Sequence, residues 1–219
     1  MHVASVNLVS LGVESPSFAR RLAHGALSAY RGYVEERRRA GAPLDAAAND
    51  AFFARQRNRG FQMGASMPEL HKLPEMERLE MHARKWGAQL LADLGADADV
   101  VDAVRADAAD FSTRFDVWAS LAGVPGATKG HDEHVHGDSL VSGAFYARAP
   151  ARSGALVLAG VARPARAGDL VVFPSNVPHS VQATALHASL GPWRCPRVCL
   201  AFNVAHARLT ADDVYKVAR

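Results

Sequence analysis

Short apolar runs in the second half of the chain restrict its fold more than any other feature of the sequence. Each run is bounded by glycine, proline or serine, and the runs fall at 115–118, 142–146, 155–159, 170–174 and 197–203. Runs of this kind predict β-strands. Short strands at roughly ten-residue spacing are typical of an antiparallel sandwich or barrel.

The chain before residue 112 has a different character. Alanine, arginine, glutamate and leucine recur there at helical spacing, which predicts helices over residues 16–40, 45–58, 74–94 and 97–109. Ser15 and Pro16 suit the start of the first helix, as a cap and a first-turn proline. We therefore expect one structural domain of the α+β class. Its helical N-terminal region (1–111) would buttress a β core (112–207), with a C-terminal tail at 208–219.

The composition is that of an ordinary globular protein. A formal charge of +3 and a pI near 9.1 are mildly basic, but the basic residues are scattered. Their densest run, Arg37-Arg38-Arg39, follows two glutamates and suits a solvated helix face, so nucleic acid is not expected as a partner. Cys195 and Cys199 are too few for a disulfide framework. Because no signal peptide or membrane-spanning run is evident, we expect a cytoplasmic protein without a membrane partner.

Histidines concentrate in the β half of the chain. His134 and His136 are two residues apart, so both would face the same side of a strand. His179 follows the run at 170–174 and a proline-framed turn. Imidazoles from two strands leave part of a metal's coordination sphere open, which suits non-haem Fe(II) better than a closed structural zinc site. The alternative is that the polar strip around His134 is ordinary surface.

Several short motifs, taken together, resemble a family of 2-oxoglutarate/Fe(II)-dependent oxygenases. The resemblance covers residues 115–205, and the matching residues are Val117-Trp118, Gly126, His134-Val135-His136, Ser142-Gly143-Ala144-Phe145-Tyr146, Gly168 to Ser175, Pro178-His179 and Arg197 to Asn203. It implies a double-stranded β-helix, that is, a jelly-roll or cupin-like core against which the N-terminal helices pack.

The resemblance also implies roles for single residues. His134 and His179 look like iron ligands, and Arg197 looks like the guanidinium that holds the distal carboxylate of 2-oxoglutarate. A planar guanidinium can bind a carboxylate through two hydrogen bonds. Tyr146 lies where related enzymes place a hydroxyl donor to the same carboxylate. The alternatives are an exposed Arg197 beside Pro196 and a half-buried strand aromatic at Tyr146.

The third protein ligand is open at this stage. The common facial triad has two histidines and one carboxylate. His136 gives a three-histidine site, whereas a register that begins at His136 gives Asp138 as the carboxylate. We favour His134, His136 and His179, because the resemblance aligns both histidines of the pair and leaves Asp138 unmatched. Gly137 and Ser120 depart from the family pattern, and residues 184–194 look like an insertion that forms either a lid or a packed loop.

The function implied by the resemblance is oxidation that uses Fe(II), O₂ and 2-oxoglutarate. The expected outcome is hydroxylation of a small molecule or a peptide side chain. One alternative is a three-histidine cupin-type dioxygenase that does not use 2-oxoglutarate, and another is a non-catalytic metal-binding β-helix module. A homodimer is compatible with each. Candidate substrate contacts are Arg55, Arg57, Gln62, His71 and Trp118, although surface or packing positions are the favoured alternative for each.

Overall fold

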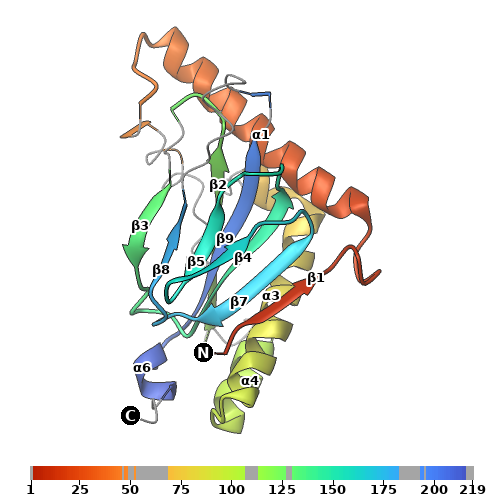
Figure 1. Ribbon diagram of the computed structural model, residues 1–219, viewed down its shortest axis with the longest axis vertical. Coiled ribbons are helices and arrows are strands. Elements are labelled where there is room, and N and C mark those ends of the chain that lie inside the picture. The colour runs from red at the N-terminus through yellow and green to blue at the C-terminus, as the bar shows by residue number, and fades with distance from the viewer. Residues whose placement is uncertain are drawn as a thin grey trace.

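Two antiparallel sheets and a layer of helices make up the computed structural model of the chain (Figure 1). The structure describes residues 2–45, 47–48, 52, 69–106, 113–126, 130–182, 193–194 and 196–215. Its helices are α1 (Pro16–Arg39), the 3₁₀ helix η1 (Glu69–Lys72), α3 (Pro74–Asp93), α4 (Ala98–Arg105) and α6 (Ala211–Val214). Three of the four predicted helices are therefore found. The helix predicted at 45–58 falls mostly on residues outside the described ranges.

The strands divide between a five-stranded and a four-stranded sheet. The larger has the order β1-β7-β4-β9-β2 and contains β1 (Ala4–Asn7), β7 (Asp169–Pro174), β4 (Val141–Arg148), β9 (Arg197–His206) and β2 (Thr113–Ala122). The smaller has the order β3-β8-β5-β6 and contains β3 (His131–His134), β8 (His179–Val181), β5 (Ala155–Leu158) and β6 (Val161–Pro164).

The path of the chain between these sheets identifies the fold. From β2 to β9 the chain alternates between the larger and the smaller sheet, except for the hairpin that joins β5 to β6. All recorded pairings are antiparallel, and β2 to β9 form two facing four-stranded layers. This winding is that of a double-stranded β-helix, so the predicted α+β fold with a jelly-roll core is confirmed.

The edge strand β1 of the larger sheet was not predicted. β1 comes from the N-terminal region that was expected to be helical, and it pairs with β7 from Ala4 opposite Val172 to Asn7 opposite Asp169. Its pairing partner lies about 160 residues away in sequence, so no local sequence pattern predicts this strand. The side chain of Asn7 fixes this edge by donating to the Asp169 carboxylate at 2.7 Å.

The larger sheet has two differently used faces, because alternate residues of a strand point to opposite sides. In β9, Val198, Leu200 and Val204 join the large apolar core beneath the helices. Arg197, Cys199 and Asn203 alternate with them and line a pocket between the two sheets. Figure 1 shows α1 and α3 on the far side of the larger sheet from β3 and β8. The helices therefore close one core and leave the inter-sheet space for the site.

The helices cover the sheet through apolar stripes at helical spacing. In α1 the fully buried Phe18, Leu22 and Tyr30 lie on one such stripe, and Phe18 meets Phe145 of β4 edge-on with ring centroids 5.5 Å apart. In α3 the buried Leu79, Ala83, Leu90 and Leu91 join the same core. Among the described helices, none has the length and apolar character that a bilayer crossing requires.

An ionic cluster fixes the segment between β1 and α1. Glu14 is only 4% exposed, and its carboxylate accepts hydrogen bonds from the guanidinium of Arg78. His82 Nε2 lies 2.7 Å from Glu14 Oε1. Arg78 and His82 both belong to α3, so the cluster ties the start of α1 to that helix. A buried carboxylate with several charge-assisted hydrogen bonds of this kind is well satisfied.

Candidate metal centre

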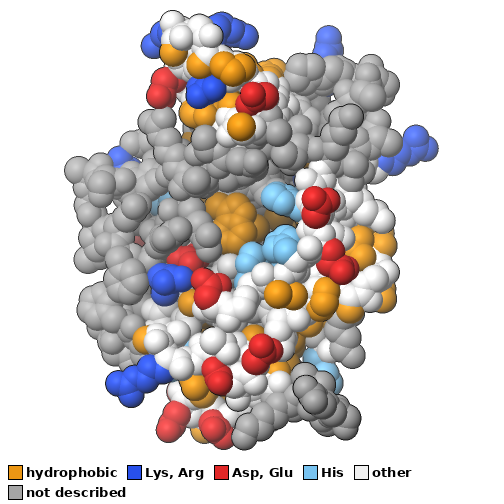
Figure 2. Space-filling model, turned by 90° about the vertical axis from the view of Figure 1, so that its left-hand side faces the viewer, with side chains coloured by type: hydrophobic (Ala, Val, Ile, Leu, Met, Phe, Trp, Pro, Cys, Tyr) orange, Lys and Arg blue, Asp and Glu red, His pale blue; other side chains and the backbone are white. Residues whose placement is uncertain are grey.

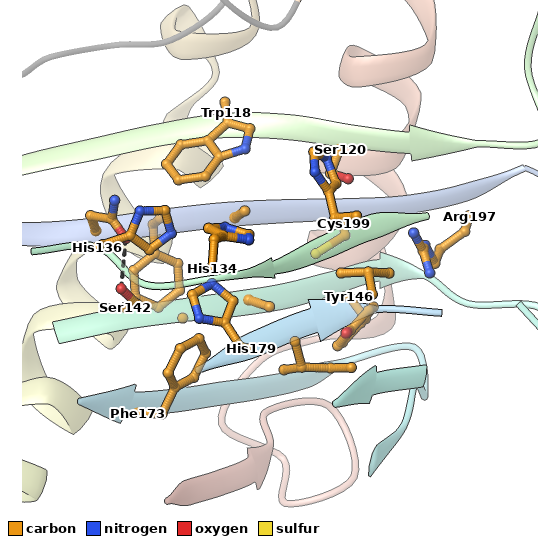
Figure 3. A pocket seen from close by; sticks show the side chains of 18 residues that line it. Trp118, Ser120, His134, His136, Ser142, Tyr146, Phe173, His179, Arg197 and Cys199 are labelled. Atoms are coloured by element: carbon orange, nitrogen blue, oxygen red, sulfur yellow. Dashed lines mark hydrogen bonds between the residues drawn. The ribbon is translucent and has the colours of Figure 1, made fainter. Parts of the chain in front are cut away.

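Three histidine side chains converge in the pocket between the sheets (Figure 3). His134, His136 and His179 each offer one ring nitrogen, and these three atoms lie within 4.8 Å of one another. The ring centroids of His134 and His179 are 4.3 Å apart, and each is 5.0 Å from that of His136. An imidazole nitrogen binds a metal ion at about 2.0–2.1 Å, so three nitrogens in such a group lie near the separation that one shared ion requires.

Two of the histidines face each other across a strand pair. His134 ends β3 and lies opposite His179, the first residue of β8. The predicted strand does not extend to His136, because β3 ends at His134. His136 reaches the group from the following loop, where its backbone N–H donates to the carbonyl oxygen of Ser175 at 2.9 Å. The pair was thus correctly predicted to lie together, but a backbone contact rather than a shared strand face places His136.

Backbone hydrogen bonds determine which ring nitrogen of two histidines is available. His134 Nδ1 lies 2.8 Å from the carbonyl oxygen of Asp132, and His179 Nδ1 lies 3.0 Å from that of Val177. A carbonyl oxygen can only accept, so each Nδ1 carries the proton and each Nε2 keeps its lone pair. This second contact is the arrangement that fixes the tautomer of metal-ligating histidines.

The surroundings of His179 favour its neutral form. Its side chain is buried beside Phe173, with ring centroids 4.9 Å apart. Loss of hydration lowers the pKa of His179 below its usual value, and the neighbouring His134 and His131 lower it further, against the opposing hydrogen bond to Val177. Neutral imidazole is the form that binds metals, so this environment suits a ligand.

The pocket opens on the face seen in Figure 2, where histidine side chains lie in a hollow beside a hydrophobic surface. Trp118 lines this pocket, and its ring meets that of His136 edge-on at a centroid distance of 6.1 Å. Of the candidate substrate contacts, Trp118 thus lines the pocket, and its contact with a substrate stays a prediction. His71 is buried in η1 and does not line the pocket, and Arg55, Arg57 and Gln62 lie outside the described residues.

Asp138 lies apart from the histidine group. It follows Gly137 in an exposed turn, and its carboxylate accepts a hydrogen bond from Ser139 Oγ at 3.2 Å. Its oxygens do not belong to the set of mutually close ligand atoms, whereas a nitrogen of His136 does. The geometry thus favours the three-histidine register, and the ligand role of each residue remains a prediction.

Arg197 places a buried positive charge in the same pocket. Its side chain is 4% exposed, and Nη1 donates to the carbonyl oxygen of Ser153 at 2.8 Å. Among the described residues, its Nε has no hydrogen-bond partner and its charge has no ion-pair partner. A buried charge without a counter-ion is costly. A negatively charged ligand in this pocket would remove that cost.

A glycine allows the chain to close over Arg197. Gly154 follows Ser153 and has a φ of +84°, which disfavours any residue with a Cβ. A Cβ at this position would lie 2.3 Å from the carbonyl oxygen of Gln182 and 3.2 Å from Arg197 Nη1. The turn can therefore supply its Ser153 carbonyl to the guanidinium only with glycine at 154.

Tyr146 and Cys199 lie between Arg197 and the histidines (Figure 3). Burial raises the pKa of Tyr146 well above its usual value, and Cys199 and Asp169 add to this while Arg197 opposes it. Burial likewise raises the pKa of the Cys199 thiol to about 12, against the opposing charge of Arg197. Both groups are thus neutral at physiological pH. Tyr146 keeps a hydroxyl proton that it can donate to an anion held by Arg197.

Three polar residues of the pocket region belong to the motifs that match the family, but the sequence predicted no role for them. Asn203 and Ser142 line the pocket and Ser175 adjoins them, and the three form one buried hydrogen-bonded chain. Period-two alternation along β9 could have revealed Asn203, since it shares a strand face with Arg197. The insertion at 184–194 is described only at its end. There Trp193 packs against Tyr30 of α1, with ring centroids 5.9 Å apart.

The residues present fit both groups that the resemblance implies. His134 and His179 offer lone pairs on Nε2, and His136 adds a third imidazole, which is a suitable donor set for Fe(II). The unpartnered Nε of Arg197, with the neutral hydroxyl of Tyr146 nearby, fits a carboxylate. Fold and site together therefore describe a double-stranded β-helix protein with a three-histidine cluster and a buried arginine in one pocket.

Comparisons with known proteins give only distant structural similarities. No family model and no curated protein matches the chain. A prolyl-4-hydroxylase from Pseudomonas putida is similar over 93% of this chain and 87% of its own, at 16% identity and a TM-score of 0.46. SnoK, a non-haem α-ketoglutarate-dependent carbocyclase from nogalamycin biosynthesis, is similar over 94% and 79%, at 12% identity and a TM-score of 0.46. A salicylate 1,2-dioxygenase from Pseudoaminobacter salicylatoxidans is similar over 42% of this chain and 20% of its own, at 22% identity and a TM-score of 0.27. The functional assignment therefore rests on the side chains of the pocket.

Proposed function

We propose that this chain is an Fe(II)- and 2-oxoglutarate-dependent oxygenase that oxidises a small molecule or a peptide side chain. One observation carries the proposal. A cluster of three histidines and a buried guanidinium without a counter-ion line the same pocket. The first suits a metal with open coordination positions, and the second suits an organic anion that reaches toward that metal.

The metal half of the proposal follows from the donor set. His134, His136 and His179 would hold Fe(II) through three imidazole nitrogens and leave its remaining positions to small ligands. Because the Nδ1 atoms of His134 and His179 are already tied to backbone carbonyls, these two rings are oriented before the metal arrives.

The 2-oxoglutarate half follows from Arg197 and its neighbours. Two guanidinium donors can grip one carboxylate, and Tyr146 can donate a further hydrogen bond. The apolar side chains of Leu156, Val181 and Phe173 line the same pocket and exclude water from it. In such surroundings a charge-assisted hydrogen bond is stronger than in water.

When bound, iron and 2-oxoglutarate supply the oxidising chemistry, in which O₂ and the co-substrate are consumed. The chain's own residues bind and orient. Arg197 and Tyr146 would fix the far end of the co-substrate, and the histidines would fix the metal. The neutral Cys199 fills the space between these two groups of residues without competing for the metal. Trp118 at the open side offers an aromatic surface to a substrate.

A second candidate is a cupin-type dioxygenase that uses three histidines and no 2-oxoglutarate. The observation that favours it is the ligand set itself, since no carboxylate joins the described cluster, whereas the common facial triad contains one. This candidate leaves the buried charge of Arg197 unexplained, unless the substrate itself is the anion.

Binding of 2-oxoglutarate tests the proposal. Calorimetric titration of the Fe(II)-loaded chain under anaerobic conditions should detect binding of 2-oxoglutarate. Arg197→Ala should weaken the affinity for 2-oxoglutarate about 10- to 100-fold. Arg163→Ala is a matched control, because Arg163 lies on β6 and does not line the pocket. This variant should bind 2-oxoglutarate as tightly as the wild type. Equal affinities in all three proteins would favour the cupin-type dioxygenase. Absence of metal binding would contradict both oxygenase candidates.

A further inference from the structure

Asn203 is fully buried in the pocket wall, yet part of its side-chain amide has no partner. The residue is 0% exposed and lines the pocket that contains the histidines. Among the described residues, its Nδ2 makes no hydrogen bond. Buried amide donors are nearly always paired, so an unpaired donor on a residue that lines a pocket points to a ligand.

A chain of hydrogen bonds holds this amide in a fixed orientation. Ser142 Oγ donates to Asn203 Oδ1 at 2.8 Å, and the hydroxyls of Ser142 and Ser175 are 2.8 Å apart. All three side chains are buried. Since Ser142 occupies Oδ1, the free edge of the amide is its N–H₂ group.

The same chain reaches one of the histidines. Ser175, whose hydroxyl bonds to Ser142, accepts the backbone N–H of His136 through its carbonyl oxygen at 2.9 Å. Asn203 is therefore linked through Ser142 and Ser175 to the loop that delivers His136. This polar chain belongs to the histidine end of the pocket and is separate from the contacts of Arg197.

The position along β9 separates Asn203 from the arginine. Both side chains lie on the pocket face of the strand, six residues apart, which corresponds to about 20 Å between their Cα atoms. Figure 3 shows Ser142 and His136 on the other side of His134 and His179 from Arg197 and Tyr146. A co-substrate of the size of 2-oxoglutarate, held at Arg197, would not extend to Asn203.

We propose that Asn203 is a ligand-binding residue whose Nδ2 donates a hydrogen bond to an acceptor atom of the primary substrate at the histidine end of the pocket. This rests on the proposed function, because it requires a ligand beside an occupied metal site. It assigns a chemical class to the substrate: a molecule that carries a carbonyl, carboxylate or hydroxyl oxygen close to the position that is oxidised. Ser142 and Ser175 act as positioning residues for the amide.

Azide binding to the Co(II)-loaded chain tests this proposal without turnover. Azide is a small anion that binds open metal positions and accepts hydrogen bonds, and Co(II) absorption in the visible range reports its binding. Asn203→Leu keeps the approximate volume and removes the donor, so azide affinity should fall about 10- to 100-fold. Asn203→Asp keeps the acceptor for Ser142 but presents a second acceptor, so it should lose at least as much. Ser120→Ala, which removes a hydroxyl from the same pocket, should leave azide affinity unchanged.

The outcomes separate the alternatives. Equal azide affinities in the wild type, Asn203→Leu and Asn203→Asp, with equal Co(II) affinity, would overturn the proposal. If Asn203→Asp kept the azide affinity of the wild type while Asn203→Leu lost it, the assignment of Nδ2 as a hydrogen-bond donor would be overturned. If Asn203→Leu does not fold, Ser142→Ala replaces it, because it frees the amide while leaving Asn203 in place. It should weaken azide in the same direction, and an unchanged affinity would again overturn the proposal. A wild-type chain that does not bind Co(II) would contradict the proposed function itself, before azide is added.

Discussion

His134 and His179 lie directly opposite each other in the register of β3 and β8, and each ring bonds through Nδ1 to the carbonyl oxygen two residues before it. The same local contact thus orients both rings from two adjacent strands. Because the strand pairing and the Nδ1 contacts exist without a metal, binding requires little reorganisation of these two ligands. His136 is instead placed by the backbone contact of its loop with Ser175.

Removal of His179 should abolish metal binding. The wild-type chain should hold about one equivalent of Fe(II) or a substitute metal after gel filtration, as measured by elemental analysis. In His179→Ala two imidazoles remain, and the ion is left largely to water. His24→Ala is a matched control, because His24 is exposed on α1 far from the pocket in sequence and fold. Unchanged stoichiometry in His179→Ala would exclude this site.

The ligand register can be decided by a pair of substitutions. We expect Asp138→Ala to keep most of the metal affinity and His136→Ala to lose much of it, since His136 and not Asp138 belongs to the close group of ligand atoms. His134→Ala should behave like His136→Ala or worse. Competition with a chromogenic chelator measures these affinities. If Asp138 proved essential and His134 dispensable, the ligand register would instead begin at His136.

Arg197 should be a residue that binds a ligand at the expense of stability. Because its charge has no counter-ion among the described residues, Arg197→Met should unfold at the same or a higher urea concentration than the wild type when no ligand is present, with a gain on the order of 1 kcal/mol. Metal with 2-oxoglutarate should stabilise the wild type and should do so far less in the variant. A variant that is strongly destabilised without ligand would show that Arg197 has a structural role.

The Glu14 cluster should contribute to stability and not to ligand binding. Glu14→Gln removes the charge that Arg78 and His82 share, and a lost charge-assisted hydrogen bond in a buried position costs about 1–3 kcal/mol. Glu35→Gln, which breaks an exposed pair with Arg38, is the control and should change stability by less than about 1 kcal/mol. Urea unfolding of the two variants gives the comparison. Similar small effects in both would show that the cluster does not anchor the segment before α1.

The fold was largely predictable because its signals are local. Helical spacing with a serine and a proline at its start predicted α1, and bounded apolar runs predicted β2, β4, β5, β7 and β9. The short β1 and β6 were missed because four residues carry little periodicity. In addition, β1 pairs with a strand that is distant in sequence, and β6 is mostly exposed, so no apolar run marks it. The predicted tail likewise contains a single turn of helix at α6.

The histidine group was predictable for a different reason. The spacing of His134, His136 and the distant His179, together with the resemblance, was enough to predict that they meet. The hydrogen bonds from Asn203 through Ser142 to Ser175 were not predictable, because they join two strands and the residue after β7, and hydroxyl contacts of this kind are set by tertiary structure. The orphaned amide that motivates the substrate assignment is visible only in three dimensions.

A crystal structure of the chain grown anaerobically with Fe(II) and 2-oxoglutarate tests the central claim most directly. Anomalous scattering at the iron edge should give one peak bonded to His134, His136 and His179, and the density of 2-oxoglutarate should run from that peak to the guanidinium of Arg197. No iron peak among these histidines, or an iron peak with 2-oxoglutarate absent from Arg197, would contradict the assignment as a 2-oxoglutarate-dependent oxygenase.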